Sequence, residues 1–175
     1  MRNHDVSWRT NLRITVGIAD LKFSKNAEDE LITHALGSCL GITVYDPVAK
    51  VGGMLHAMLP DSTIDASKAE ANPEMFVDRG VPRLFRGAYE MGAEKSRLIV
   101  MVAGGATIAQ SAENDRFQIG QRNFTMLRKL LWKNSVLIAA QDVGGNCSRT
   151  MILRLDTGEV SLKVSGAAET LLKAA

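Results

Sequence analysis

The sequence has little of several features that mark particular classes of protein. Its 175 residues include only two cysteines, aromatic residues make up 5% of the chain, and the formal net charge is +2. Two cysteines do not form a disulfide framework, and so weak a charge, without a long run of Lys or Arg, offers no surface for nucleic acid. Sparse aromatic residues also provide few platforms for stacking bases. We therefore expect two reduced thiols and no nucleic-acid partner.

Long apolar runs are also missing. No stretch approaches the roughly 18 apolar residues that a transmembrane helix needs, and residues 1–11 lack the apolar run of a signal peptide. Hydrophobic residues nevertheless make up 46% of the chain, enough for the core of one domain. We predict a cytoplasmic protein without direct membrane insertion. It has an N-terminal tail at 1–12, one domain at 13–165, and a C-terminal tail or short helix at 166–175.

The apolar pattern predicts a mixture of strands and helices. Alternating or β-branched segments indicate strands at residues 13–23, 31–36, 40–45, 54–59, 97–102, 136–141, 151–155 and 160–164. Apolar residues at helical spacing predict helices at 81–91 and 120–134, and the polar segment 61–72 is expected to be an exposed loop. The fold class is therefore α/β (α+β): a single-domain layered sandwich of mostly antiparallel or mixed strands with about two main helices. The order of the strands does not follow from the sequence.

Cys39 stands in a glycine-flanked turn between two of the predicted strands. Glycine allows a tight turn in Leu36-Gly37-Ser38-Cys39-Leu40-Gly41 and lets a substrate approach the backbone closely. Backbone N–H groups in such a turn can point to one spot and hold an oxyanion, so Gly37 and Ser38 are candidates for an oxyanion and substrate loop beside a thiol nucleophile. A buried structural cysteine is the competing interpretation, because free cysteine is among the most buried residue types.

A thiol nucleophile needs a base, and His56 is the histidine that a hairpin would bring closest. A turn centred near Val48 pairs residues whose numbers sum to about 96, which places His56 opposite roughly Leu40, beside Cys39. His34 precedes Cys39 across the glycine break, so its direction is open. A core histidine with both nitrogens bonded to the backbone is an equal alternative on this spacing alone.

Thr33 is the candidate for a third group in such a site. A general base works best when its other ring nitrogen bonds to an oxygen that sets its tautomer, and a threonine can supply that oxygen. A β-branched residue that fills a strand is the default interpretation of a lone threonine. No metal is expected, because the chain has no CxxC, HxH or HExxH spacing, and Gly104-Gly105 and Gly144-Gly145 belong to no phosphate-binding pattern and indicate turns.

Two runs resemble the signature of the CheD family of chemoreceptor glutamine deamidases: Leu36-Gly-Ser-Cys-Leu-Gly-Ile-Thr-Val-Tyr-Asp-Pro47 and Gly52-Gly-Met-Leu-His-Ala-Met-Leu-Pro60. Thr33 lies six residues before Cys39 and His56 lies seventeen after it, as in the Thr–Cys–His constellation of that family. Later segments agree, namely Val102-Ala-Gly-Gly-Ala106, Ile119-Gly-Gln-Arg-Asn123, Asp142-Val-Gly-Gly145 and Asp156-Thr-Gly-Glu159. Gln121, where a Glu is common, and Asn146-Cys147-Ser148 depart from the family pattern. The resemblance runs from about residue 13 to residue 164.

This resemblance implies a protein-glutamine deamidase, an amidohydrolase that converts specific chemoreceptor glutamines to glutamates in chemotaxis. Cys39 would be the nucleophile that forms a thioester, His56 the general base and acid, and Thr33 the group that orients His56. The resemblance implies no cofactor, and it implies two partners: the cytoplasmic helical domains of chemoreceptors and a CheC-type phosphatase. The alternatives are a CheD-like adapter that binds receptors or the phosphatase with little turnover, and another Cys–His enzyme such as a peptidase.

Overall fold

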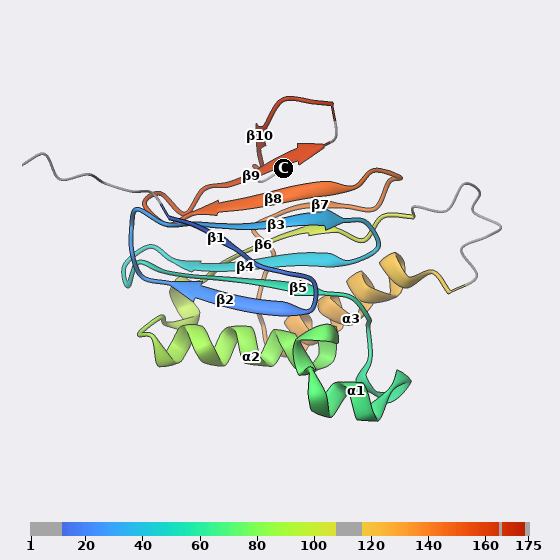
Figure 1. Ribbon diagram of the computed structural model, residues 1–175. Helices are drawn as coiled ribbons and strands as arrows, with labels where there is room; N and C mark the ends of the chain where they lie inside the picture. The colour runs from blue at the N-terminus through green and yellow to red at the C-terminus, as the bar shows by residue number, and fades with distance from the viewer. Residues whose placement is uncertain (1–11, 108–116, 165, 174–175) are drawn as a thin grey trace, which may run out of the picture.

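The computed structural model describes residues 12–107, 117–164 and 166–173 (Figure 1). The strands of this part are β1 (Arg13–Thr15), β2 (Asp20–Ser24), β3 (Glu30–Leu36), β4 (Leu40–Asp46), β5 (Val51–Ala57), β6 (Ile99–Gly104), β7 (Ala140–Val143), β8 (Arg149–Arg154), β9 (Val160–Val164) and β10 (Thr170–Leu171). The α-helices are α1 (Ala66–Ala71), α2 (Val77–Glu90) and α3 (Ile119–Lys133). Short 3-10 turns lie at η1 (Ser62–Ile64), η2 (Pro73–Met75) and η3 (Lys95–Arg97). No helix of this part is long and apolar enough to cross a membrane.

These elements form three layers (Figure 1). The outer sheet has five strands in the order β1-β3-β8-β9-β10, and the central sheet has five in the order β2-β5-β4-β6-β7. Helices α2 and α3 cover the face of the central sheet that points away from the outer sheet. Strands β4 and β5 are buried along their whole length because the central sheet is covered on both faces. This explains why both strands read as nearly continuous apolar runs.

Two apolar clusters fill the spaces between the layers. The first lies between the central sheet and the helices, where Val81 and Leu84 of α2 and Leu127 of α3 pack on the strands. The second lies between the two sheets and includes Leu36, Tyr45, Met54, Met151 and Leu153. Because side chains alternate along a strand, each residue of β4 and β5 faces one cluster or the other. Burial of both clusters drives the stacking of the layers.

The predicted fold class is confirmed: the chain is a layered α/β domain with two mixed sheets and two long helices. Helix α2 begins at Val77 and strand β5 at Val51, each a few residues before its predicted start, and three further segments also differ from the prediction. Residues 13–23 do not form one strand, because the chain turns after Thr15 and Ala19 adopts a φ of 54°, so β1 and β2 enter different sheets. The segment 61–72 is not a plain loop, because Asp61 and Asp65 cap η1 and α1 by accepting from backbone N–H groups. The strand expected at 136–141 begins only at Ala140.

The two ends of the chain were predicted to lie outside the domain. Residues 1–11 of the predicted N-terminal tail lie outside the described residues. In the C-terminal segment, where the sequence left a tail or a short helix open, the described residues form no helix, and Thr170 and Leu171 pair with β9 as strand β10. Leu172 also donates its N–H to the carbonyl of Val160 at 2.8 Å.

Candidate active site

His56 lies in the middle of the central sheet, on β5. It is fully buried, and its backbone is opposite Gly41 of β4 on one side and Asp20 of β2 on the other. Met54, two residues earlier on the same face, belongs to the cluster between the sheets, so the imidazole points toward the outer sheet. The predicted hairpin is confirmed, with a register one residue from the predicted one. That register places the glycine, which has no side chain, directly opposite the imidazole.

Thr33 reaches His56 from the other sheet. It lies on β3, is fully buried, and its Oγ1 is 2.7 Å from Nδ1 of His56. The same hydroxyl donates to the carbonyl oxygen of Val16 at 2.8 Å. Because a hydroxyl has one hydrogen and the carbonyl can only accept, Oγ1 must accept from His56, which therefore carries its proton on Nδ1. The other nitrogen, Nε2, is then an unprotonated acceptor.

Asp20, the other neighbour of His56, does not take this role. Its carboxylate accepts from the N–H groups of Gly17 at 3.1 Å and Leu21 at 2.8 Å and pairs with Lys22 at 3.0 Å. Thr33 therefore supplies the oxygen that contacts the imidazole. A hydroxyl fixes the tautomer of the ring but stabilises a positive charge on it less than a carboxylate would.

Cys39 lies in the turn that carries the chain from β3 in the outer sheet to β4 in the central sheet. It is half-buried and packs against the cluster between the sheets, on the face that also carries His56. Continuing the β4–β5 register places Cys39 opposite Met58. His56, two residues before Met58, is therefore the diagonal neighbour of Cys39, and side chains on diagonal positions can reach each other when one of them is long. The structure thus brings the three predicted residues into one region between the sheets.

The turn is held by the glycine pair at the end of β6. Gly105 donates its N–H to the carbonyl of Cys39 and Ala106 donates to that of Gly37, both at 2.8 Å. Gly104 has a φ of 110°, and a Cβ there would lie 2.1 Å from the Cys39 carbonyl oxygen, so this position requires glycine. Within the described residues, the N–H groups of Ser38 and Cys39 donate to no backbone carbonyl.

Burial controls the protonation of the site. It raises the pKa of the Cys39 thiol above its usual 9.0, although the N–H of the same residue opposes this, and it lowers the pKa of His56 from 6.5 to about 4. Both groups are therefore neutral at neutral pH. Nε2 of His56 is buried and has no hydrogen-bond partner among the described residues. Nε2 of His56 can therefore accept the proton of a thiol as the sulfur of that thiol attacks a substrate carbon.

Other residues singled out by the sequence lie elsewhere. His34 is exposed on the far face of the outer sheet, where its Nδ1 is 3.2 Å from Oγ1 of Thr150. Cys147 is exposed, and its thiol bonds to Asn146. Across the described part of the chain, no three His, Cys, Asp or Glu side chains gather in a way that could hold a metal ion.

Sequence reasoning missed one buried contact of the turn. Asn123 of α3 is fully buried, and its Nδ2 donates to the carbonyl oxygens of Ser38 and Met58, both at 2.9 Å. The only signal in the sequence was the Ile-Gly-Gln-Arg-Asn segment, to which no role could be given before the position of α3 was known.

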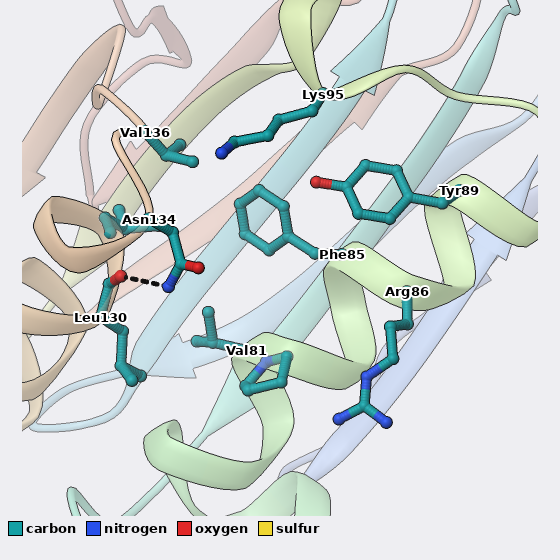
Figure 2. Close-up of a pocket in the computed structure, with 10 residues that line it drawn as sticks. Val81, Phe85, Arg86, Tyr89, Lys95, Leu130, Asn134 and Val136 are labelled. Atoms are coloured by element: carbon teal, nitrogen blue, oxygen red, sulfur yellow. Dashed lines mark hydrogen bonds between the residues drawn. The ribbon is translucent and has the colours of Figure 1, made fainter.

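A groove between α2 and α3 is separate from this region (Figure 2). It has a volume of about 380 Å³ and is lined by residues such as Val81, Phe85, Tyr89, Lys95 and Leu131. Val81, Phe85 and Leu131 belong to the apolar cluster on the helix-facing side of the central sheet, whereas Thr33 and His56 lie between the sheets. The groove therefore takes no part in the candidate site.

Comparison with known proteins identifies the family of the chain. The family described as CheD chemotactic sensory transduction matches residues 58–164, more than half of the chain. The chain belongs to the CheD family. A probable chemoreceptor glutamine deamidase CheD 1 of Syntrophus aciditrophicus (strain SB) is 50% identical over 153 residues, which cover 87% of this chain and 94% of the relative. A probable chemoreceptor glutamine deamidase CheD of Solibacter usitatus (strain Ellin6076) is 45% identical over 91% of this chain and 94% of its own. A CheD relative of the same description from Pyrococcus abyssi (strain GE5 / Orsay) is 40% identical over 86% and 90%.

The resemblance seen in the sequence is thereby confirmed at the level of the family. The matched CheD segment starts after His56, so it includes Asn123 and both glycine pairs but none of Thr33, Cys39 and His56. The geometry of these three residues and the motifs that surround them support their assignment as the candidate site.

Proposed function

We propose that this CheD-family chain is a protein-glutamine deamidase that acts on chemoreceptors, with Cys39 as its nucleophile. The observation that carries the proposal is the Thr33–His56 pair, which is buried between the sheets on the face that carries Cys39 and whose Nε2 has no partner among the described residues. Most buried polar side-chain atoms have a hydrogen-bond partner, so a buried imidazole nitrogen without one favours a chemical role over a purely structural one. The names of the relatives, chemoreceptor glutamine deamidases, supply the substrate class.

The reaction follows from these groups. Nε2 of His56 takes the proton of the Cys39 thiol as the sulfur attacks the carbon of a glutamine side-chain amide. The N–H groups of Ser38 and Cys39 hold the oxyanion of the tetrahedral intermediate. His56 returns the proton to the nitrogen, the C–N bond breaks, and ammonia leaves a thioester on Cys39. His56 then takes a proton from water, which attacks the thioester, and glutamate and the free thiol are released.

Chemoreceptor cytoplasmic domains are the proposed substrate, so the proposed compartment is the cytoplasm. An amide at the end of a flexible side chain can reach a thiol at a turn, whereas a peptide bond inside a helix is hydrogen-bonded and shielded. The family resemblance further suggests a CheC-type phosphatase as a second partner. No metal or organic cofactor enters the proposed chemistry.

The test is to incubate the protein with a folded receptor cytoplasmic fragment and to map the products by intact-mass and peptide-mass analysis. We expect carboxylates at a few glutamines, with the backbone uncut and asparagines unchanged, because a misplacement of about 1 Å reduces rates by on the order of 10². Replacing those glutamines by asparagine should stop the reaction there. Backbone cleavage would support a peptidase instead, and tight binding without any mass change would support an adapter.

A further inference from the structure

Asn123 joins the two segments that carry the proposed nucleophile and base. Ser38, whose carbonyl it binds, directly precedes Cys39, and Met58 follows His56 by two residues. Both partners are carbonyl oxygens, which only accept, so the side-chain amide must present its NH₂ group to them. Both hydrogens of that group are thereby used. The other end of the amide, Oδ1, is buried and has no partner among the described residues.

The bond to Ser38 also controls the direction of the Cys39 N–H. The Ser38 carbonyl and the Cys39 N–H belong to the same planar trans peptide unit, in which C=O and N–H point in opposite directions. Holding the carbonyl against α3 therefore aims the N–H away from α3. A hydrogen bond accepted by the carbonyl also polarises the peptide unit and strengthens its N–H as a donor.

We propose that Asn123 is a positioning residue that aims the Cys39 N–H at the oxyanion of the reaction and fixes the nucleophile turn relative to the end of β5. This inference rests on the proposed function and adds a residue to it. Asn123 contacts neither substrate nor reacting atoms. It acts through the Ser38–Cys39 peptide unit.

The packing of α3 supports this role. A Cβ at Gly120, one turn before Asn123, would lie 2.5 Å from the carbonyl oxygen of Gly105, so α3 packs against the backbone of the glycine pair with no room for a side chain. Gly105 in turn donates its N–H to the Cys39 carbonyl. The N-terminal half of α3 thus contacts the peptide units on both sides of the Cys39 α-carbon, one directly through Asn123 and one through Gly105.

Asn123→Ala should lower kcat for receptor deamidation by about 10²-fold, the effect of losing one oxyanion donor, while KM stays unchanged. The rate of Cys39 alkylation by iodoacetamide, measured in a Cys147→Ser background, should change little, because that displacement forms no oxyanion. Asn123→Ser, which keeps one donor and is smaller, provides a second variant should the alanine protein fail to fold. The matched control is Asn134→Ala, at the other end of α3, where Nδ2 also donates to a carbonyl, that of Leu130 at 2.8 Å (Figure 2).

Wild-type kcat in both folded Asn123 variants would overturn the inference, and so would an equal fall in kcat and in alkylation, which indicates a collapsed turn. If the wild-type protein itself does not deamidate receptors, it is the proposed function that fails. The inference is then decided by the amide ¹⁵N–¹H resonance of Cys39. A resonance that moves in Asn123→Ala but not in Asn134→Ala supports the inference, and one that moves in neither overturns it.

Discussion

The two ends of the β4–β5 hairpin each bury a polar side chain completely, but they differ in how fully that side chain is hydrogen-bonded. At the closed end, the Asp46 carboxylate accepts from the N–H groups of Val48 at 2.9 Å, Ala49 at 3.0 Å and Glu94 at 2.8 Å. It also pairs with Arg97 at 2.9 Å. At the open end, His56 has one bonded nitrogen and one buried nitrogen without a partner in the described structure.

The pKa values of these two groups reflect the same difference. Burial alone would raise the pKa of Asp46, but the Arg97 guanidinium and the three N–H groups outweigh it and hold the pKa well below 3.8. For His56, burial is the cause of the shift, and it lowers the pKa to about 4. A buried polar group with every bond made stabilises the fold, whereas one with a bond left open is available for chemistry. Five predictions test this contrast.

The largest expected effect is on the nucleophile at the open end. Cys39→Ala should abolish receptor deamidation, because no other described thiol faces His56. Cys147→Ser should retain most of the activity, since that thiol is exposed and bonds to Asn146. Deamidation is measured by mass mapping of the receptor fragment. Near wild-type turnover by Cys39→Ala would refute the assignment of the nucleophile.

His56→Ala should lower kcat by about 10²–10⁴-fold, the usual contribution of a general base. The imidazole makes one side-chain hydrogen bond within the described residues, so the loss of stability should come from the cavity it leaves, and kcat is therefore compared per folded molecule. His34→Ala is the control, and it should be mild because that ring lies on the far face of the outer sheet. A severe defect in His34→Ala beside an active His56→Ala would contradict the geometry of the hairpin.

Asp46→Ala should show the opposite pattern to His56→Ala. Loss of the carboxylate leaves buried N–H donors unpaired, so the free energy of unfolding should fall by about 1–3 kcal/mol, while kcat per folded molecule stays near wild type. Because the folded pKa lies below the unfolded value of 3.8, the stabilisation is present above that value and is lost as pH falls below it. Urea unfolding of both proteins from neutral to acid pH measures this. A stability gap that widened on acidification would contradict the prediction.

Thr33→Val should have a smaller effect, on the order of a tenfold loss of kcat, since it removes about one hydrogen bond and the control of the His56 tautomer. KM should not change, because Thr33 lies beneath the imidazole and is fully buried. Thr33→Ser keeps the hydroxyl and should restore most of the rate. Steady-state kinetics of the wild type, Thr33→Val and Thr33→Ser measure these effects. An inactive Thr33→Ser would indicate that Thr33 acts by packing and not through its hydroxyl.

The smallest expected change is in the pH dependence of the wild-type enzyme on the acid side. With the pKa of His56 lowered from 6.5 to about 4, the base stays unprotonated through neutral and mildly acid pH. kcat/KM should therefore vary little between neutral pH and about pH 5, and it should fall near the lowered pKa. A profile of kcat/KM against pH measures this. An acid limb near 6.5 would mean that His56 is not desolvated in the free enzyme.

Several features of the fold and site were predictable because they depend on neighbouring residues. The glycine turn at Cys39 and the apolar runs on either side of Asp46-Pro47 predicted the β4–β5 hairpin, and a hairpin fixes its own register to within about one residue. The helix that became α3 was visible in its apolar spacing. The two caps formed by Asp61 and Asp65 were missed, although their signal is local.

The sequence by itself thus determined the identity of the nucleophile and base candidates, the hairpin that brings them together, and the family. Only the tertiary structure decided that Thr33 reaches His56 from a different sheet, 23 residues away, and that Asn123 reaches Ser38 across 85 residues. The physical reason is that apolar periodicity specifies which face of an element is buried but not which element covers it. That choice is made by the packing of the two sheets and α3 against one another, and the same packing buries Nε2 of His56 without a partner in the described part of the chain.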